Sequence, residues 1–211
     1  MEGSIRSTKS QPVTSTGPTV EPTCLGSSST EVAVALQKLI TEVIGTYMIV
    51  FTGCAAIVVN KITAGSITHA GICVTWGLII MIIVYTLEHI SCHFNPAVTI
   101  TYALLRGFSW KQVPLYIVAQ LLGSILASWT LTLLLDVTPE AYFGTVPSGS
   151  DAQSVVMEFI ISFILMFVIF GTAFDERAHN QFAGIAIGMT ILMNALFAGL
   201  ASTLHPFFPP P

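Results

Sequence analysis

Five long apolar runs, separated by shorter polar segments, set the pattern of this 211-residue chain. They cover residues 36–59, 68–87, 113–135, 155–174 and 182–200. A helix needs about 20 apolar residues to cross the hydrocarbon core of a bilayer, and every run is close to that length or longer. The pattern therefore predicts an all-α membrane protein with five spans.

A short segment, "HFNPAVTI", lies between the second and third apolar runs. Asparagine is a strong N-cap and proline suits the first helical turn, so Asn95 and Pro96 predict the start of a helix that Ala97 continues. This helix is too short to span. If it folds back into the membrane, its free N–H groups and positive dipole end face the midplane, where they repel cations and orient neutral solutes. An ordinary loop is the alternative that the tripeptide alone leaves open.

Composition agrees with a lipid environment and excludes several classes of function. Hydrophobic residues make up 53% of the chain and charged residues 9%, against about 25% charged in soluble domains. The net charge is −4, and no basic cluster indicates a nucleic-acid partner. The sequence holds no Gly-rich phosphate loop, Cys-x-x-Cys pair or zinc-protease helix motif. It therefore predicts no enzyme, no cofactor and no metal site.

The two ends of the chain differ from the apolar middle. Residues 1–35 are rich in Ser, Thr, Pro and Gly and predict a disordered leader. Basic residues concentrate before or at the start of the first run and after the second and fourth runs, whereas only Lys61 falls on the other side. Those on the first side are Arg6, Lys9, Lys38, Arg106, Lys111 and Arg177. The excess of positive charge places the N-terminus in the cytoplasm.

An internal repeat relates the two halves. The segment "TEVIGTYMIVFTG" from Thr41 is similar to "MEFIISFILMFVIFG" from Met157, and "GICVTWGLIIM" from Gly71 is similar to "GIAIGMTILMN" from Gly184. The paired segments lie three spans apart along the chain, so the copies insert in opposite directions and form an inverted repeat, in which solute paths run between the halves. The first repeat covers residues 36–135. The second, 153–200, is incomplete, because a Pro-rich tail at 201–211 stands where the counterpart of Asn95 is expected.

Several phrases carry a resemblance to a known family. "GTYMIVFTGCAAIVVNK", "HAGICVTWGLIIM", "HFNPAVTI" and "WKQVPLYIVAQLLGS" resemble the aquaporin superfamily, and within it the plant nodulin-like intrinsic proteins. The resemblance covers about residues 38–199. It implies an inverted-repeat helical bundle that assembles as a tetramer, with one pore in each subunit. That bundle has six spans and two half-helices, and the resemblance therefore predicts five spans and one re-entrant half-helix here, with the sixth span and second half-helix missing.

The resemblance also implies roles for single residues. Asn95, within the Asn95-Pro96-Ala97 motif, would donate its side-chain amide to permeants at the midplane, and His93 would lie in the extended backbone before it. Trp76 matches the bulky filter residue of the second span. Ala195 matches the fifth-span filter position, where an alanine implies a wider constriction.

Three glutamates need a role inside or beside the spans. Glu42 and Glu158 occupy related places near the start of a span in each repeat, which favours structural carboxylates that hold the re-entrant loops. A proton relay with His89 or His93 is the alternative, because intramembrane charges are functional candidates by default. Glu88 stands where the aquaporin family has glycine. The loop between His89 and His93 is one residue shorter than in that family. We expect Glu88 to lie at the cytoplasmic end of a helix.

The sequence thus predicts a multi-pass channel for passive transport of water and small uncharged solutes such as glycerol, urea and metalloid acids. Its partners would be membrane lipids, these permeants and the other subunits of a homo- or hetero-tetramer, in the plasma membrane or an endomembrane. Two alternatives stay open. One is a non-conducting subunit that assembles with full-length relatives and regulates them. The other is a proton-coupled carrier or membrane enzyme that uses Glu42, Glu88 and the loop histidines.

Overall fold

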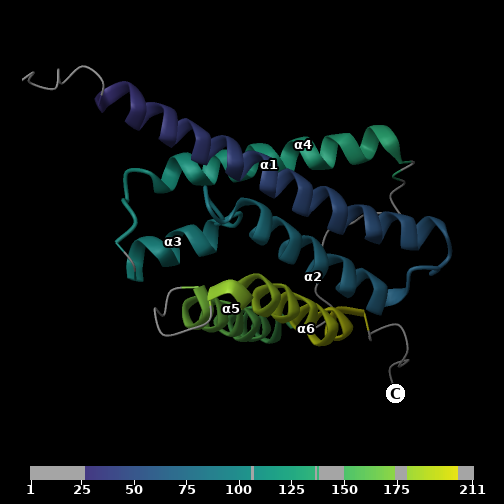
Figure 1. Ribbon diagram of the computed structural model, residues 1–211. Coiled ribbons are helices and arrows are strands. Elements are labelled where there is room, and N and C mark those ends of the chain that lie inside the picture. Colours follow the sequence, from purple (N-terminus) through teal and green to yellow (C-terminus); the bar gives the residue numbers. More distant parts are fainter. Residues whose placement is uncertain (1–26, 106, 136, 138–149, 174–179, 204–211) are drawn as a thin grey trace, which may run out of the picture.

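The computed structural model describes residues 27–105, 107–135, 137, 150–173 and 180–203, and every regular element in these ranges is helical (Figure 1). The elements are α1 (Ser27–Ile62), α2 (Thr68–Leu87), α3 (Pro96–Leu105), α4 (Val113–Leu134), α5 (Asp151–Ala173), η2 (Asn180–Phe182) and α6 (Ala183–Thr203). The all-α prediction is therefore confirmed for the described part. Residues 1–26 of the predicted leader and 204–211 of the predicted tail lie outside the described residues.

The first helix starts earlier than predicted. α1 begins at Ser27, so residues 27–35, which were expected to belong to a disordered leader, are helical. This stretch includes Glu31, Ala33 and Ala35, which are good helix formers, and no proline interrupts it. Helix propensity and continuity with the apolar run explain the difference.

The short helix α3 has the length of half a span. Its ten residues extend about 15 Å at 1.5 Å per residue, half of a hydrocarbon core of about 30 Å. Asn95 caps it, because its Oδ1 accepts a hydrogen bond of 2.8 Å from the N–H of Ala97. Pro96 takes the first helical position, where no N–H is needed. The Asn-Pro pair starts a helix, as the sequence predicts.

The helices form three layers. Figure 1 shows α1 and α4 on one side, α5 and α6 on the other, and α2 and α3 between them. The main packing partners agree with this order, because α1 packs on α4 and α2, α2 packs on α6, and α6 packs on α5. One apolar cluster joins α3, α5 and α6 through Val98, Tyr102, Ile169, Ala183 and Ile187. A second joins α1 and α2 through Ile49, Ile79 and Ile83.

Glycines bring two pairs of helices into backbone contact. A methyl group on Gly77 of α2 would lie 2.8 Å from the carbonyl oxygen of Gly188 of α6, and one on Gly188 would lie 2.6 Å from that of Gly77. Likewise, a methyl on Gly123 of α4 would lie 2.5 Å from the carbonyl oxygen of Val43 of α1. Small residues permit this close approach between apolar helices, for which lipid supplies little hydrophobic driving force.

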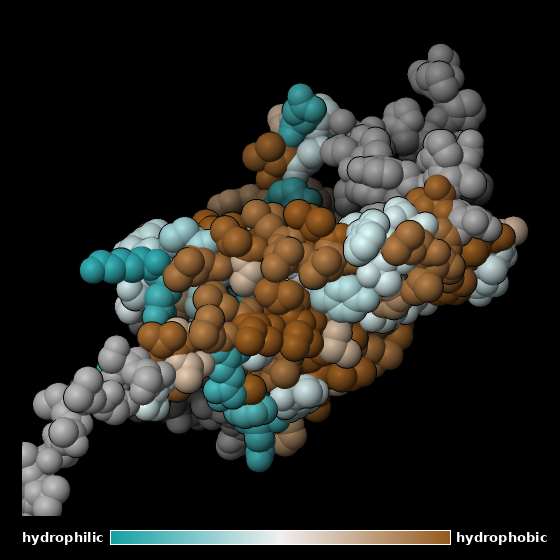
Figure 2. All heavy atoms as spheres, turned by 90° about the horizontal axis from the view of Figure 1, so that it is seen from above, coloured by the Kyte–Doolittle hydropathy of each residue, from teal (hydrophilic) through white to brown (hydrophobic). Residues whose placement is uncertain are grey.

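The outer surface suits a membrane. Four helices, α1, α2, α4 and α5, are long and apolar enough to cross a bilayer, whereas the apolar run Ala183–Gly199 of α6 is shorter. The fifth span therefore stays a prediction. Figure 2 shows apolar side chains over most of the face seen from above, and large exposed hydrophobic residues recur along α4 and α5. Within the most apolar stretch of α5, only 6% of the residues are buried.

The glycine crossing of α2 and α6 gives a test of the packing. Gly77→Val is expected to destabilise the protein by about 2 kcal/mol, because added methyl groups overpack a backbone contact. The measurement is the midpoint of thermal unfolding in detergent. Gly171→Val is the matched control, since a methyl at Gly171 of α5 meets nothing within 4 Å. Equal midpoints for the two variants would show that the crossing is loose.

Candidate functional site

The segment before α3 is held by one buried carboxylate. Glu42 lies in the middle of α1 and is 0% exposed. It accepts four hydrogen bonds, from Ser91 Oγ at 2.6 Å, the His93 N–H at 2.9 Å, the Phe94 N–H at 2.7 Å and Gln120 Nε2 at 2.9 Å. Hydrogen bonds to an ionised acceptor are the strong ones, and this number satisfies a buried carboxylate. Glu42 therefore ties the non-helical backbone of residues 91–94 to α1 and α4.

A second set of hydrogen bonds connects this network to α3. Gln120 Nε2 also donates to Thr99 Oγ1 at 2.9 Å, and the Thr99 hydroxyl donates to the Asn95 carbonyl oxygen at 3.0 Å. His93 Nδ1 lies 3.2 Å from the same Thr99 oxygen. Because the single hydroxyl proton is used toward Asn95, Nδ1 of His93 must be the donor in that pair. The first turn of α3 is thus fixed to α4 through side chains.

The ring of His93 is enclosed by aromatic side chains. Its centroid lies 4.3 Å from that of Tyr102 on α3, 4.9 Å from that of Tyr116 on α4 and 4.9 Å from that of Phe108 in the connection between them. His93 lies in the non-helical segment before Asn95. Its imidazole packs between α3 and α4, which suits a residue that fixes the half-helix.

Asn95 presents its amide outward. Its side chain is exposed, and its Oδ1 is used by the Ala97 N–H, which turns Nδ2 away from the helix end. Within the described residues, no acceptor takes a hydrogen bond from Nδ2. Two amide hydrogens therefore remain available beside the positive end of α3. This arrangement can donate to the oxygen atom of a neutral solute and disfavours a cation.

Trp76 and Ala195 lie at another depth of the bundle. The Trp76 ring packs on Gly53 of α1 and on the cluster of α1 and α2. Helices α2 and α6 run antiparallel, because Gly77 faces Leu192 and His69 contacts Leu196. This pairing brings Ala195 of α6 within about one turn of the level of Trp76.

The two levels are separated along α1. Phe94, next to Asn95, packs on Gly45, whereas Trp76 packs on Gly53. Eight residues of helix correspond to about 12 Å. The site residues therefore form two levels, the Asn95 motif and, further along α1, Trp76 with Ala195.

The second predicted carboxylate differs from the first. Glu158 is exposed on α5, whereas Glu42 is buried, so a structural role for Glu158 stays a prediction. The physical reason for the difference in burial is packing: α5 contacts α6 and η2 and leaves most of its apolar length uncovered, whereas α1 is packed against two helices. A different polar residue joins α6 to α5 instead, because Asn194 Nδ2 donates to the carbonyl oxygen of Ile161 at 2.9 Å.

Sequence reasoning missed three residues of the network, Ser91, Thr99 and Gln120. One signal was present, because Gln120 is a polar side chain in the middle of the apolar run 113–135 and such residues usually have a partner. Ser91 and Thr99 gave none, since hydroxyl side chains are common in apolar helices and loops.

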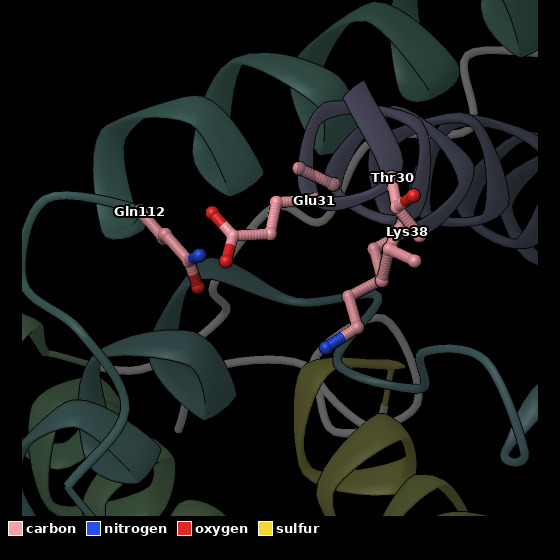
Figure 3. A pocket seen from close by; sticks show the side chains of 6 residues that line it. Thr30, Glu31, Lys38 and Gln112 are labelled. Atoms are coloured by element: carbon pink, nitrogen blue, oxygen red, sulfur yellow. The ribbon is translucent and has the colours of Figure 1, made fainter. Parts of the chain in front are cut away.

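A hollow lies elsewhere on the surface. It has a volume of about 370 Å³ and is lined by Thr30, Glu31, Val34, Ala35, Lys38 and Gln112. Figure 3 shows it between the first turns of α1 and the residue that precedes α4, with Glu31 directed toward Gln112. The hollow shares no residue with the Asn95 motif or the Glu42 network, so it is not the solute site. Among the described residues, no three His, Cys, Asp or Glu side chains gather in a way that could hold a metal ion.

Comparisons with known proteins agree with this geometry. Residues 28–204 match the model of the major intrinsic protein family. The chain is 65% identical over 82% of its length to the NIP-type aquaporin of Nicotiana alata, and 54% identical over 78% to nodulin-26 of Glycine max. It covers 64% and 61% of these relatives, less than two thirds of each. The chain belongs to the major intrinsic protein family.

A solved structure supports the fold. The aquaglyceroporin of Plasmodium falciparum superimposes with a TM-score of 0.67 at 26% identity, over 78% of this chain and 73% of that one. The described helices therefore have the aquaporin fold, which confirms the predicted fold class. The number of spans is not decided by this comparison.

The buried carboxylate gives a test of the site. Glu42→Gln is expected to destabilise the protein by about 3 kcal/mol, because the new amide group places a donor against the donors of residues 91–94. Thermal unfolding in detergent measures the change. Glu158→Gln, an exposed carboxylate on α5, is the matched control and should shift stability by no more than about 0.5 kcal/mol. A small effect at Glu42 would contradict its assigned role.

Proposed function

We propose that the chain forms a passive path through the membrane for water and small uncharged solutes such as glycerol, urea and metalloid acids. The observation that carries this proposal is the free amide of Asn95, presented at the start of a half-helix whose Ala97 N–H and Thr99 hydroxyl are already engaged. A neutral solute passing in single file would exchange hydrogen bonds with this amide, and no covalent step is involved. The positive end of α3 disfavours cations at the same point.

The other site residues have supporting roles in this proposal. Pro96 and Ala97 shape the first turn of α3, and the Ala97 N–H holds the side-chain oxygen Oδ1 of Asn95. His93 holds the half-helix from the side of α4. Trp76 and Ala195 form the filter level, where a small alanine opposite a large ring would admit solutes larger than water.

The distribution of charge favours a channel over a carrier or enzyme. Both oxygens of Glu42 are used by the loop, and Glu88 and Glu158 are exposed near or on helix surfaces. A proton-coupled carrier needs ionisable groups that converge on a pathway. Membership of a family of channels points the same way.

We further propose a multi-pass protein with its N-terminus in the cytoplasm, located in the plasma membrane or an endomembrane, that assembles as a homo- or hetero-tetramer. The excess of Lys and Arg on one side supports the orientation. The exposed apolar face of α5 supports assembly, and it includes Phe159, Phe163 and Phe167, which are 60–71% exposed. The same face favours a second candidate function, that of a non-conducting subunit that regulates longer relatives.

Permeability measurements on the purified chain test the proposed path. Proteoliposomes should swell faster than empty vesicles in water and glycerol gradients, as followed by stopped-flow light scattering. Asn95→Asp should remove more than about half of this increase, because a carboxylate replaces the donor amide at the motif.

A matched variant controls for the Asn-to-Asp change itself. Asn60 uses Oδ1 to accept hydrogen bonds from the N–H groups of Ile67 and Thr68, and an aspartate keeps both. Asn60→Asp should therefore leave the swelling rate unchanged. Wild-type rates equal to those of empty vesicles would exclude conduction by this chain, and its co-purification with a longer relative would then support the subunit role.

A further inference from the structure

One face of α1 carries three contacts to the segment before α3. Glu42, Gly45 and Ile49 are spaced by three and four residues, which places them in a row on the same side of the helix. Glu42 accepts the N–H of Phe94, Gly45 faces the Phe94 ring, and Ile49 belongs to the apolar cluster on which Phe94 packs. All three contacts converge on the residue directly before Asn95.

The backbone of Phe94 has an unusual conformation. Its φ is 50°, in the left-handed region that bulky side chains rarely adopt. This torsion lies at the junction between the non-helical residues 91–94 and the start of α3, directly before Asn95. A conformation of this kind persists only when its surroundings hold it.

Two restraints together fix the φ torsion of Phe94, the residue directly before Asn95. The hydrogen bond to Glu42 fixes the N–H of Phe94 at 2.7 Å, but it leaves rotation about the next bond free. The position of the ring restrains that rotation, because it fixes the direction of the side chain from the same α-carbon. With both groups held, the φ torsion of Phe94 and the position of its carbonyl carbon, to which Asn95 is bonded, are fixed.

The ring fits because residue 45 has no side chain. A methyl group on Gly45 would lie 2.6 Å from Cδ1 and 2.8 Å from Cζ of Phe94 and still closer to Cε1. These three atoms form one edge of the ring, so the whole edge rests on the α1 backbone. We name this contact the Phe94 seat: Gly45 supplies the notch and Phe94 the ring.

We propose that the Phe94 seat sets the direction of the Asn95 amide, so that Gly45 and Phe94 are positioning residues of the solute path. This inference rests on the proposed function and assigns a role to residues that do not touch the solute. A side chain at position 45 would displace the ring, rotate the peptide before Asn95 and move the amide away from passing solutes.

A double-mutant cycle tests the seat. Gly45→Ala should lower the water permeability of proteoliposomes by about fivefold, on the scale of couplings between residues in contact. Phe94→Leu should have a smaller effect, because it removes the ring edge without filling the notch. The combination of Gly45→Ala with Phe94→Leu should recover most of the permeability. Gly171→Ala on α5, where a methyl meets nothing within 4 Å, is the matched control and should behave as wild type.

A second measurement does not depend on conduction. The side-chain amide resonance of Asn95 in a ¹⁵N-labelled sample, assigned by its loss in Asn95→Asp, should move in Gly45→Ala and return in the double variant. It should stay in place in Gly171→Ala. If the wild-type chain does not conduct, the proposed function fails and this resonance alone decides the seat.

Each outcome has a fixed meaning. Additive effects of the two substitutions on permeability, or an Asn95 resonance that does not move in Gly45→Ala, would overturn the role of the seat. Recovery in the double variant together with the return of the resonance would establish it, because the resonance reports the surroundings of the Asn95 amide in the folded protein and does not report the amount of folded protein.

Discussion

The Glu42 carboxylate is the constraint on which the half-helix depends. Non-helical backbone at membrane depth survives only where protein or water satisfies its polar groups. Residues 91–94 have that support because one buried carboxylate takes two of their backbone N–H groups and a serine hydroxyl. The same carboxylate binds Gln120 of α4, so the contact between α1 and α4 is also part of the site. Burial makes each of these hydrogen bonds stronger and makes the loss of any one expensive.

Close helix packing is what brings these groups together. The backbone contact at Gly123 brings α4 to α1, which places Gln120 within reach of both Glu42 and Thr99. The contact between Gly77 and Gly188 sets α2 and α6 side by side and puts Trp76 and Ala195 at similar levels. The proposed path thus has two levels, a donor level at Asn95 and a steric level about two helical turns away.

Local signals in the sequence predicted the elements well but the network poorly. Asn95 and Pro96 start a helix because capping chemistry acts within a few residues, and the apolar runs are helical because lipid leaves the backbone few other choices. The repeat predicted equal roles for Glu42 and Glu158, yet only Glu42 is buried. A repeat describes ancestry and local pattern, whereas burial depends on which helices cover the position.

The sequence by itself determined the membrane class, the helices and the half-helix, because hydrophobic length and end-capping are local properties. Only the tertiary structure decided that Ser91, Thr99 and Gln120 join Glu42, and that the Phe94 ring rests on Gly45. These contacts join residues 21 to 78 positions apart. Their geometry follows from how closely the helices approach, which no single segment specifies.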